Sequence, residues 1–259
     1  MKEVKAGYDV NSNRITFWLN GKMRCEEVPA GISTLDWLHQ HFQMYGTKCS
    51  CNEGDCGACT VVIAWPYEGL IEYKAINSCL YPAAKLHGRH LITIEGIGSP
   101  DALHPIQAAL LEHHGTQCGY CTPGFVMSMF ALFAMHQNPN REVIMAALEG
   151  NLCRCTGYQS ILEAAEELSQ VLSPQSCVPD WCRNVEAELY NFKAPAQLIL
   201  HHATAPRSVH RYLMPEDMKS LLDYIAVERE AVFIAGGTDI MVQRNIAKKK
   251  FPVLIDLCR

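Results

Sequence analysis

The chain has 259 residues, 49% of them hydrophobic and 19% charged, which is the composition of a globular protein large enough for two or three small cores. The formal net charge of −5 provides no basic surface for a phosphate backbone, so nucleic acid is not an expected partner. There is no apolar run of about 18 residues and no signal-peptide core, so the sequence predicts a cytoplasmic protein without a membrane-spanning segment.

The N-terminal part of the chain alternates β-rich runs with one helical pattern. Residues 15–19 and 23–25 flank Asn20-Gly21, the dipeptide that favours a type I′ hairpin turn. Ser33 can cap a helix that leads into a cysteine-rich loop. Strands are then predicted over 60–65, 71–76 and 91–95. We therefore expect residues 1–95 to form a β-grasp domain of the ferredoxin type.

From His104 the pattern becomes helical. The sequence predicts helices from Pro105 to a stop at Gly115, over 123–136, from a cap at Asn140 to Gly150, and over 160–172. In an up-down-up-down bundle, the loop between the first two helices and the loop between the last two lie at the same end. Residues 96–172 are therefore expected to be a four-helix bundle that brings two cysteine-bearing loops together.

The remaining chain is predicted to be a linker followed by a third unit. Four prolines interrupt residues 173–208, which show no sustained periodicity. Within 209–259 we expect a helix over 215–225 and a buried strand over 231–235, which runs directly into a small-residue turn. Backbone N–H groups in such a turn can hold a phosphate, although Gly-Gly turns are mostly only turns.

Thirteen cysteines in a reducing compartment indicate metal or redox chemistry in place of disulfides. The first set has the C-x4-C-x2-C…C spacing of plant-type [2Fe-2S] proteins. Its members are Cys51, Cys56, Cys59 and Cys79. A structural zinc site is the alternative, but zinc usually takes its thiolates from two C-x2-C pairs. Cys49 could compete as a ligand, and the register with the later cysteines favours a non-ligand role.

The second set combines C-x2-C with C-x-C on the two bundle loops. Its members are Cys118, Cys121, Cys153 and Cys155. A C-x-C pair suits a two-iron cluster better than ordinary zinc chelation. Cys177 and Cys182, in the predicted linker, are interpreted as ordinary thiols.

The residues around both sets resemble the molybdenum hydroxylases, the family of xanthine dehydrogenase and aldehyde oxidase. Gln117-Cys118-Gly119-Tyr120-Cys121-Thr122-Pro123-Gly124 and Gly150-Asn151-Leu152-Cys153-Arg154-Cys155-Thr156-Gly157-Tyr158 are similar to the second iron-sulfur domain of this family. The first loop, from Gly46-Thr47-Lys48 to Cys56-Gly57-Ala58-Cys59, is similar to its first. Cys49-Ser50 and Gln159-Ser160 depart from the family pattern without replacing a ligand.

The resemblance implies the cofactors and the residues that hold them. Each cysteine set would bind one [2Fe-2S] cluster, and Gln117 would contact the pyranopterin of a molybdenum cofactor on a partner subunit. The third unit is similar to the start of the family's FAD domain. Its flavin-contacting turn would be Ala235, Gly236, Gly237, Thr238 and Asp239. The family's FAD domain is much longer, so the resemblance implies a truncated small subunit with an incomplete core.

Taken together, the sequence predicts an α+β protein with a β-grasp domain (1–95), a helical cluster domain (96–172), a linker (173–208) and the start of an FAD domain (209–259). The resemblance implies the iron-sulfur subunit of a xanthine dehydrogenase. This subunit would work in a hetero-oligomer with a molybdopterin-binding large subunit. Electrons would pass through both clusters to FAD and NAD during purine hydroxylation, with no catalytic residue on this chain. The alternatives are a small subunit of an aldehyde oxidase or other molybdenum hydroxylase, a free-standing ferredoxin-like carrier, and a structural zinc protein.

Overall fold

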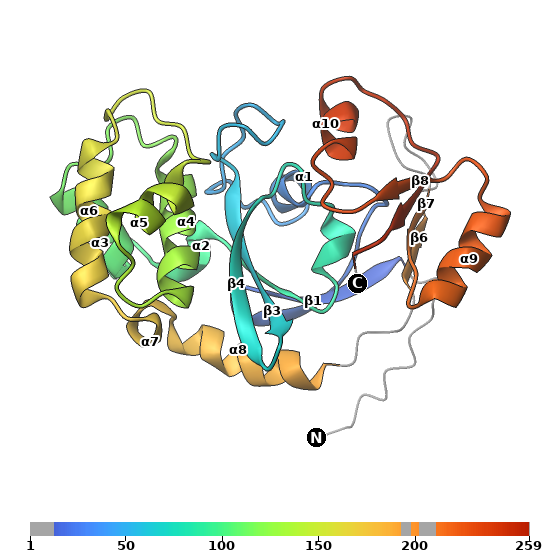
Figure 1. Cartoon of the computed structure of the whole chain (residues 1–259), viewed down its shortest axis with the longest axis horizontal. Coiled ribbons are helices and arrows are strands. Elements are labelled where there is room, and N and C mark those ends of the chain that lie inside the picture. The colour runs from blue at the N-terminus through green and yellow to red at the C-terminus, as the bar shows by residue number, and fades with distance from the viewer. Residues whose placement is uncertain (1–12, 193–197, 202–210, 259) are drawn as a thin grey trace.

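The computed structural model describes residues 13–192, 198–201 and 211–258. Its elements form a helical group, a central five-stranded sheet and a four-stranded sheet made by the C-terminal part of the chain (Figure 1). The protein is thus of the α+β class, as the sequence predicts. None of the helices in the described part is long and apolar enough to cross a membrane.

The central sheet has the strand order β2-β1-β5-β3-β4. Strands β1 (Arg14–Leu19) and β2 (Lys22–Glu27) form the expected hairpin, in which both Asn20 and Gly21 have positive φ angles. Strand β1 runs parallel to β5 (His90–Ile92), and β3 (Thr60–Tyr67) pairs antiparallel with both β5 and β4 (Leu70–Asn77). This mixed sheet with one crossing helix is the β-grasp arrangement.

The helix α1 (Thr34–Gln40) begins where the sequence predicts, because the hydroxyl of Ser33 accepts a hydrogen bond from the Asp36 N–H at 3.0 Å. The predicted strand over 91–95 was too long. It ends at Ile92, and a short helix α2 (Ile94–Ile97) follows. The Thr93 N–H donates to the side chain of Asn20 instead of to a neighbouring strand, which ends the ladder there. A short 3-10 helix, η1 (Ala83–Leu86), lies between β4 and β5.

The helical group contains the four predicted helices. They are α3 (Pro105–Glu112), α4 (Thr122–Met135), α5 (Arg141–Leu148) and α6 (Gln159–Val171). Helix α4 is buried along almost its whole length because it packs against the other helices and against one face of the sheet. That face contributes Val62, Ala64 and Tyr73 to the helical core, so the two regions share one hydrophobic core.

The expected absence of regular structure after Leu172 was wrong. Residues 174–191 form helices α7 (Pro174–Cys177) and α8 (Asp180–Asn191). Pro174 is the first residue of α7 and Pro179 precedes α8, positions at which proline favours a helix instead of interrupting it. Trp18 Nε1 donates to Glu188 at 2.6 Å, so α8 lies against the central sheet. Residues 198–201 of the predicted linker form a strand, and residues 193–197 and 202–208 lie outside the described residues.

The C-terminal sheet has the order β6-β7-β9-β8. It consists of β6 (Leu198–His201), β7 (Arg211–Met214), β8 (Val232–Ile234) and β9 (Val253–Asp256), with helices α9 (Met218–Val227) and α10 (Ile240–Asn245) between strands. The predicted helix over 215–225 therefore begins three residues later. Tyr212, Met241 and Leu254 are fully buried in the core of the β-grasp domain. The C-terminal segment thus buries its apolar side chains against that domain.

Two candidate cysteine centres

The first cysteine set lies between α1 and β3, with its last member just after β4. Cys59 and Cys79 are buried and in contact. The thiol of Cys79 donates a hydrogen bond to the sulfur of Cys59 and thereby lowers the pKa of Cys59 to about 7, while the same contact raises the pKa of Cys79. One buried pair of sulfurs therefore forms at the base of the loop.

Cys51 and Cys56 form the second pair of this set. Burial alone would raise the pKa of Cys51, but hydrogen bonds from the Glu53 N–H and from the Cys56 thiol lower it on balance. The Glu53 N–H lies 3.5 Å from the Cys51 sulfur. A backbone N–H that points at a sulfur stabilises the thiolate form, which is the form that binds iron.

The second set lies on the two loops that the bundle brings to one end. Cys121 contacts Cys153, and Cys118 contacts Cys155. Burial, followed by the contact with Cys153, raises the pKa of Cys121 to about 12. Burial opposes thiolate formation at Cys153 as well, but the hydroxyl of Thr156, 3.1 Å from its sulfur, and the Thr156 N–H lower its pKa overall.

Each set is thus arranged as two pairs of sulfurs. A [2Fe-2S] cluster has two irons, each of which takes two protein ligands, whereas a structural zinc ion needs four thiolates around one point. The paired arrangement fits a two-iron cluster better than zinc.

The two sets are joined by backbone contacts between their loops. The Leu152 N–H, next to Cys153, donates to the carbonyl oxygen of Cys56 at 2.9 Å. Gly57, which follows Cys56, has a φ of +67°, and an added Cβ there would lie 2.3 Å from the carbonyl oxygen of Gly150. The absence of a side chain at Gly57 therefore allows the second loop to approach the first.

Asn151 is a residue of this contact to which the sequence analysis gave no role. Its side chain is buried, donates to the Gly57 carbonyl at 3.1 Å and accepts from the Ser128 hydroxyl at 2.6 Å. Tyr120 also connects the loops, because its hydroxyl donates to the carbonyl of Cys49. The sequence carried no signal for this role, because the partners of Asn151, Ser128 and Gly57, are distant in sequence.

Other predicted residues lie at the surface of these centres. Gln117 is exposed beside Cys118, and Cys49 is exposed at the rim of the first set. In the Gly-Gly turn only Gly237 is buried, and a Cβ on it would lie 2.7 Å from the carbonyl oxygen of Leu80, the residue after Cys79. The turn borders a pocket of about 430 Å³ that Gly236 and Thr238 line together with Trp65, Tyr81 and Arg89.

Two family models match the chain. The model of a 2Fe-2S iron-sulfur cluster binding domain covers residues 17–83, and that of a [2Fe-2S] binding domain covers residues 93–166. The first cysteine set falls within the first of these matches and the second set within the second. The chain therefore contains two [2Fe-2S]-binding domains.

The relatives of the chain are large oxidoreductases. Xanthine dehydrogenase/oxidase of Rattus norvegicus is 32% identical over 279 residues, which cover 95% of this chain and 21% of that protein. Aldehyde oxidase 3 of Rattus norvegicus is 44% identical over 162 residues, which cover 61% of this chain and 12% of that protein. The chain thus spans about a fifth or less of the length of these two relatives.

A solved structure shows the same fold in a shorter chain. In the crystal structure of quinoline 2-oxidoreductase from Pseudomonas putida 86, one chain is 33% identical, with a TM-score of 0.53. The match covers 61% of the present chain and 95% of that one. About three fifths of this chain therefore corresponds to nearly a whole chain of that protein.

Proposed function

The chain belongs to the molybdenum hydroxylase family, and on that premise we propose that it carries electrons, one at a time, between a molybdopterin site on a partner subunit and a flavin. Its cluster ligands would be the two cysteine sets, Cys51, Cys56, Cys59 and Cys79 for one and Cys118, Cys121, Cys153 and Cys155 for the other. A [2Fe-2S] cluster, when bound, accepts and releases a single electron. The chain's own residues hold the two sites at a fixed separation and control their surroundings.

The contact between the loops is the observation that carries this proposal. The Leu152 N–H donates a hydrogen bond to the carbonyl oxygen of Cys56. Cys56 is a proposed ligand of the first set, and Leu152 directly precedes Cys153 of the second. Asn151 and Gly57 keep the loops in this contact. A zinc protein or two independent carriers would not require the sites to adjoin, whereas a relay does.

The partner would lie next to the second set. Gln117 is exposed beside Cys118, where a molybdopterin-binding subunit could reach it. The quinoline 2-oxidoreductase chain, 95% of which is covered by the match, supports an arrangement in which the clusters lie on a separate subunit of a hetero-oligomer. The bundle set would then be the entry point for electrons.

The flavin would lie next to the first set. We propose that Ala235, Gly236, Gly237, Thr238 and Asp239 contact its phosphates. Gly237 packs on Leu80, which follows the proposed ligand Cys79. This proximity supports the first set as the exit point, from which electrons would pass to FAD and then to NAD.

Purine hydroxylation, of hypoxanthine or xanthine, is the proposed reaction of the complex. The match to xanthine dehydrogenase/oxidase extends over 95% of the chain and includes the C-terminal unit. An aldehyde oxidase is the second candidate because the cluster domains are 44% identical to aldehyde oxidase 3. Identification of the subunit that copurifies with the native chain, and of the substrate that reduces the complex, would distinguish the two.

Metal analysis tests the central proposal. The purified chain is expected to contain about four irons and about four acid-labile sulfides, with the visible absorption of [2Fe-2S] clusters. Cys56→Ser should remove about half of the iron, whereas Cys25→Ser, at an exposed cysteine outside both sets, should remove none. A colourless protein that contains zinc would refute the proposal. A stable monomer with full electron-transfer activity would favour a free-standing carrier.

A further inference from the structure

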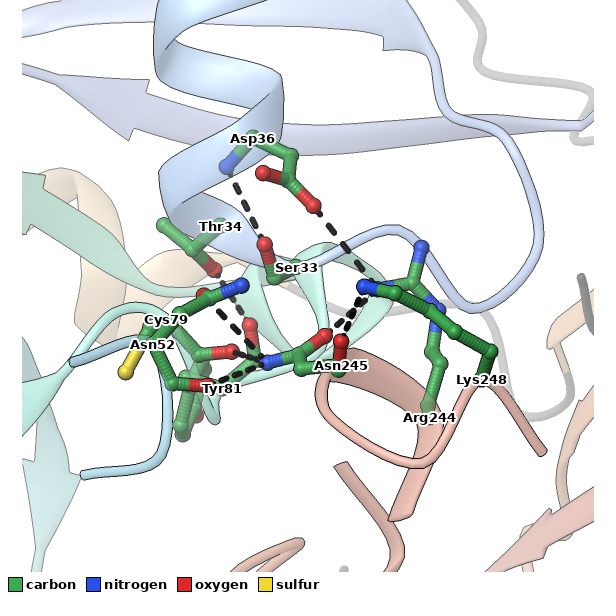
Figure 2. A network of polar contacts seen from close by, with 9 residues as sticks. All are labelled: Ser33, Thr34, Asp36, Asn52, Cys79, Tyr81, Arg244, Asn245 and Lys248. Carbon is green, nitrogen blue, oxygen red and sulfur yellow. Dashed lines mark hydrogen bonds and ion pairs between the residues drawn. The ribbon is translucent and has the colours of Figure 1, made fainter. Parts of the chain in front are cut away.

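The C-terminal unit touches the loop of the first cysteine set through one buried amide. Asn245, the last residue of α10, is 4% exposed, and its Nδ2 donates to the carbonyl oxygen of Cys79 at 2.9 Å (Figure 2). The same nitrogen lies 3.2 Å from the carbonyl oxygen of Asn52, the residue after Cys51. One side chain therefore contacts the backbone at both ends of the cysteine loop.

The orientation of this amide is fixed by its partners. Two of the oxygens that face Nδ2 are the backbone carbonyls of Cys79 and Asn52, which only accept hydrogen bonds, so the NH₂ group must point toward the loop. Oδ1 of Asn52 lies 3.4 Å from the same nitrogen. On the other side, Oδ1 of Asn245 accepts from Nη1 of Arg244 at 2.9 Å. The amide is thus held between the Arg244 donor on one side and acceptor oxygens of the cysteine loop on the other.

The residues around Asn245 fix α10 to the β-grasp domain. Nη1 of Arg244 lies 3.7 Å from Oδ2 of Asp36, which belongs to the first turn of α1 (Figure 2). Lys248 donates to the backbone carbonyl of Asn245. Asn52 has a positive φ of 60°, so its peptide group has a defined, less common orientation that the contact with Asn245 stabilises.

We infer that Asn245 is a positioning residue for the first cluster, through which the docked C-terminal unit sets the reduction potential of that cluster. This inference rests on the proposed function. Cys51 and Cys79 belong to different pairs of sulfurs, so Asn245 connects the backbone near both halves of the site.

Electrostatics determines the direction in which loss of Asn245 shifts the reduction potential of the first cluster. Reduction adds one negative charge to the site, and hydrogen bonds and net charge near a cluster determine its potential. The NH₂ group of Asn245 has its positive end toward the loop, and it offsets the negative ends of two carbonyl groups there. Removal of this donor therefore makes reduction less favourable.

The test compares two substitutions at Asn245 with two at Gln243, a residue of the same helix that contacts Asp239 and Lys249 instead of the loop. Asn245→Asp keeps the shape but replaces the donor with a negative charge, and Asn245→Leu removes the donor without adding charge. Gln243→Glu and Gln243→Leu are the matched controls. The reduction midpoint of each cluster is measured by titration of its EPR signal, which Cys56→Ser assigns to the first or the second set.

We expect a lower midpoint of the first cluster in Asn245→Asp, a smaller decrease in Asn245→Leu, and unchanged midpoints of the second cluster. If the leucine variant does not load iron, the isosteric aspartate variant decides the outcome. A first-cluster midpoint in Asn245→Asp that equals that of Gln243→Glu, or exceeds that of the unsubstituted chain, would overturn the inference. The iron content of the unsubstituted chain tests the proposed function separately.

Discussion

Replacement of Gly57 by alanine tests whether the two cysteine loops must approach as closely as they do. The added Cβ would lie 2.3 Å from the Gly150 carbonyl oxygen and 2.9 Å from Cα of Asn151, both of which are backbone atoms. The loops would have to separate to relieve this contact. Such overpacking costs about 1–3 kcal/mol, in addition to about 1–2 kcal/mol for a Cβ in a left-handed conformation.

Gly119 provides the matched control for this substitution. It lies between Cys118 and Cys121 as Gly57 lies between Cys56 and Cys59, and its φ of +79° gives a similar conformational cost. The nearest atom to an added Cβ is Oγ1 of Thr116 at 4.0 Å, so Gly119→Ala creates no close contact. Because both variants place a Cβ in a left-handed conformation, the difference between their free-energy costs isolates the cost of separating the loops.

Hydrogen exchange at the Leu152 N–H measures that separation directly, because this group donates to the Cys56 carbonyl. A loss of about 1–3 kcal/mol corresponds to an exchange rate roughly 5- to 140-fold higher in Gly57→Ala. Gly119→Ala should leave the rate close to that of the unsubstituted chain. Equal rates in both variants would show that the close approach at Gly57 does not hold the loops together.

Three further substitutions test other parts of the structure. Lys85→Met leaves the buried carboxylate of Asp256 without its cation and should lower the free energy of unfolding by about 3–5 kcal/mol in urea denaturation. Burial lowers the pKa of His90 to about 3, and the unfolded chain binds this proton near the ordinary value of about 6.5. As the pH falls from about 6.5 toward about 3, the free energy of unfolding should therefore decrease by about 1.4 kcal/mol per pH unit. His90→Gln should reduce this slope. Cys49→Ser should retain the full iron content, since we expect no ligand role for this thiol.

Each of these predictions has a contrary outcome. Lys74→Met, at an exposed lysine, is the control for Lys85→Met, and equal stabilities of the two variants would contradict a role for the buried ion pair. An unchanged slope of stability against pH in His90→Gln would place the protonation elsewhere. Loss of about half of the iron in Cys49→Ser would make this cysteine a ligand in place of one of the four proposed.

Local signals predicted much of the fold. The hairpin at Asn20-Gly21, the cap at Ser33 and the cap at Asn140 each depend on a few neighbouring residues, and all three are present. The cysteine spacing separated the two sets, and the order of the helices predicted that the two cysteine-bearing loops of the bundle lie at the same end. These features need no knowledge of distant contacts.

Features that depend on distant contacts were not predicted. Pro174 and Pro179 were interpreted as interruptions although each stands at the start of a helix. The spacing of Val185 and Leu189, both buried against the sheet, was the available signal for α8. Asn245 carries no such signal, since its role arises only when α10 packs on a loop about 190 residues earlier.

Helix α8 also determines where the chain can be divided for separate study. Its Cys182 is buried in the helical core, whereas Val185 and Leu189 pack on Trp18 of the central sheet. A shortened protein that ends at Leu172, where the bundle's last helix is complete, would expose the indole of Trp18 and part of the bundle core to solvent. One that ends after Phe192 would keep both covered but would uncover the β-grasp core against which Tyr212, Met241 and Leu254 pack.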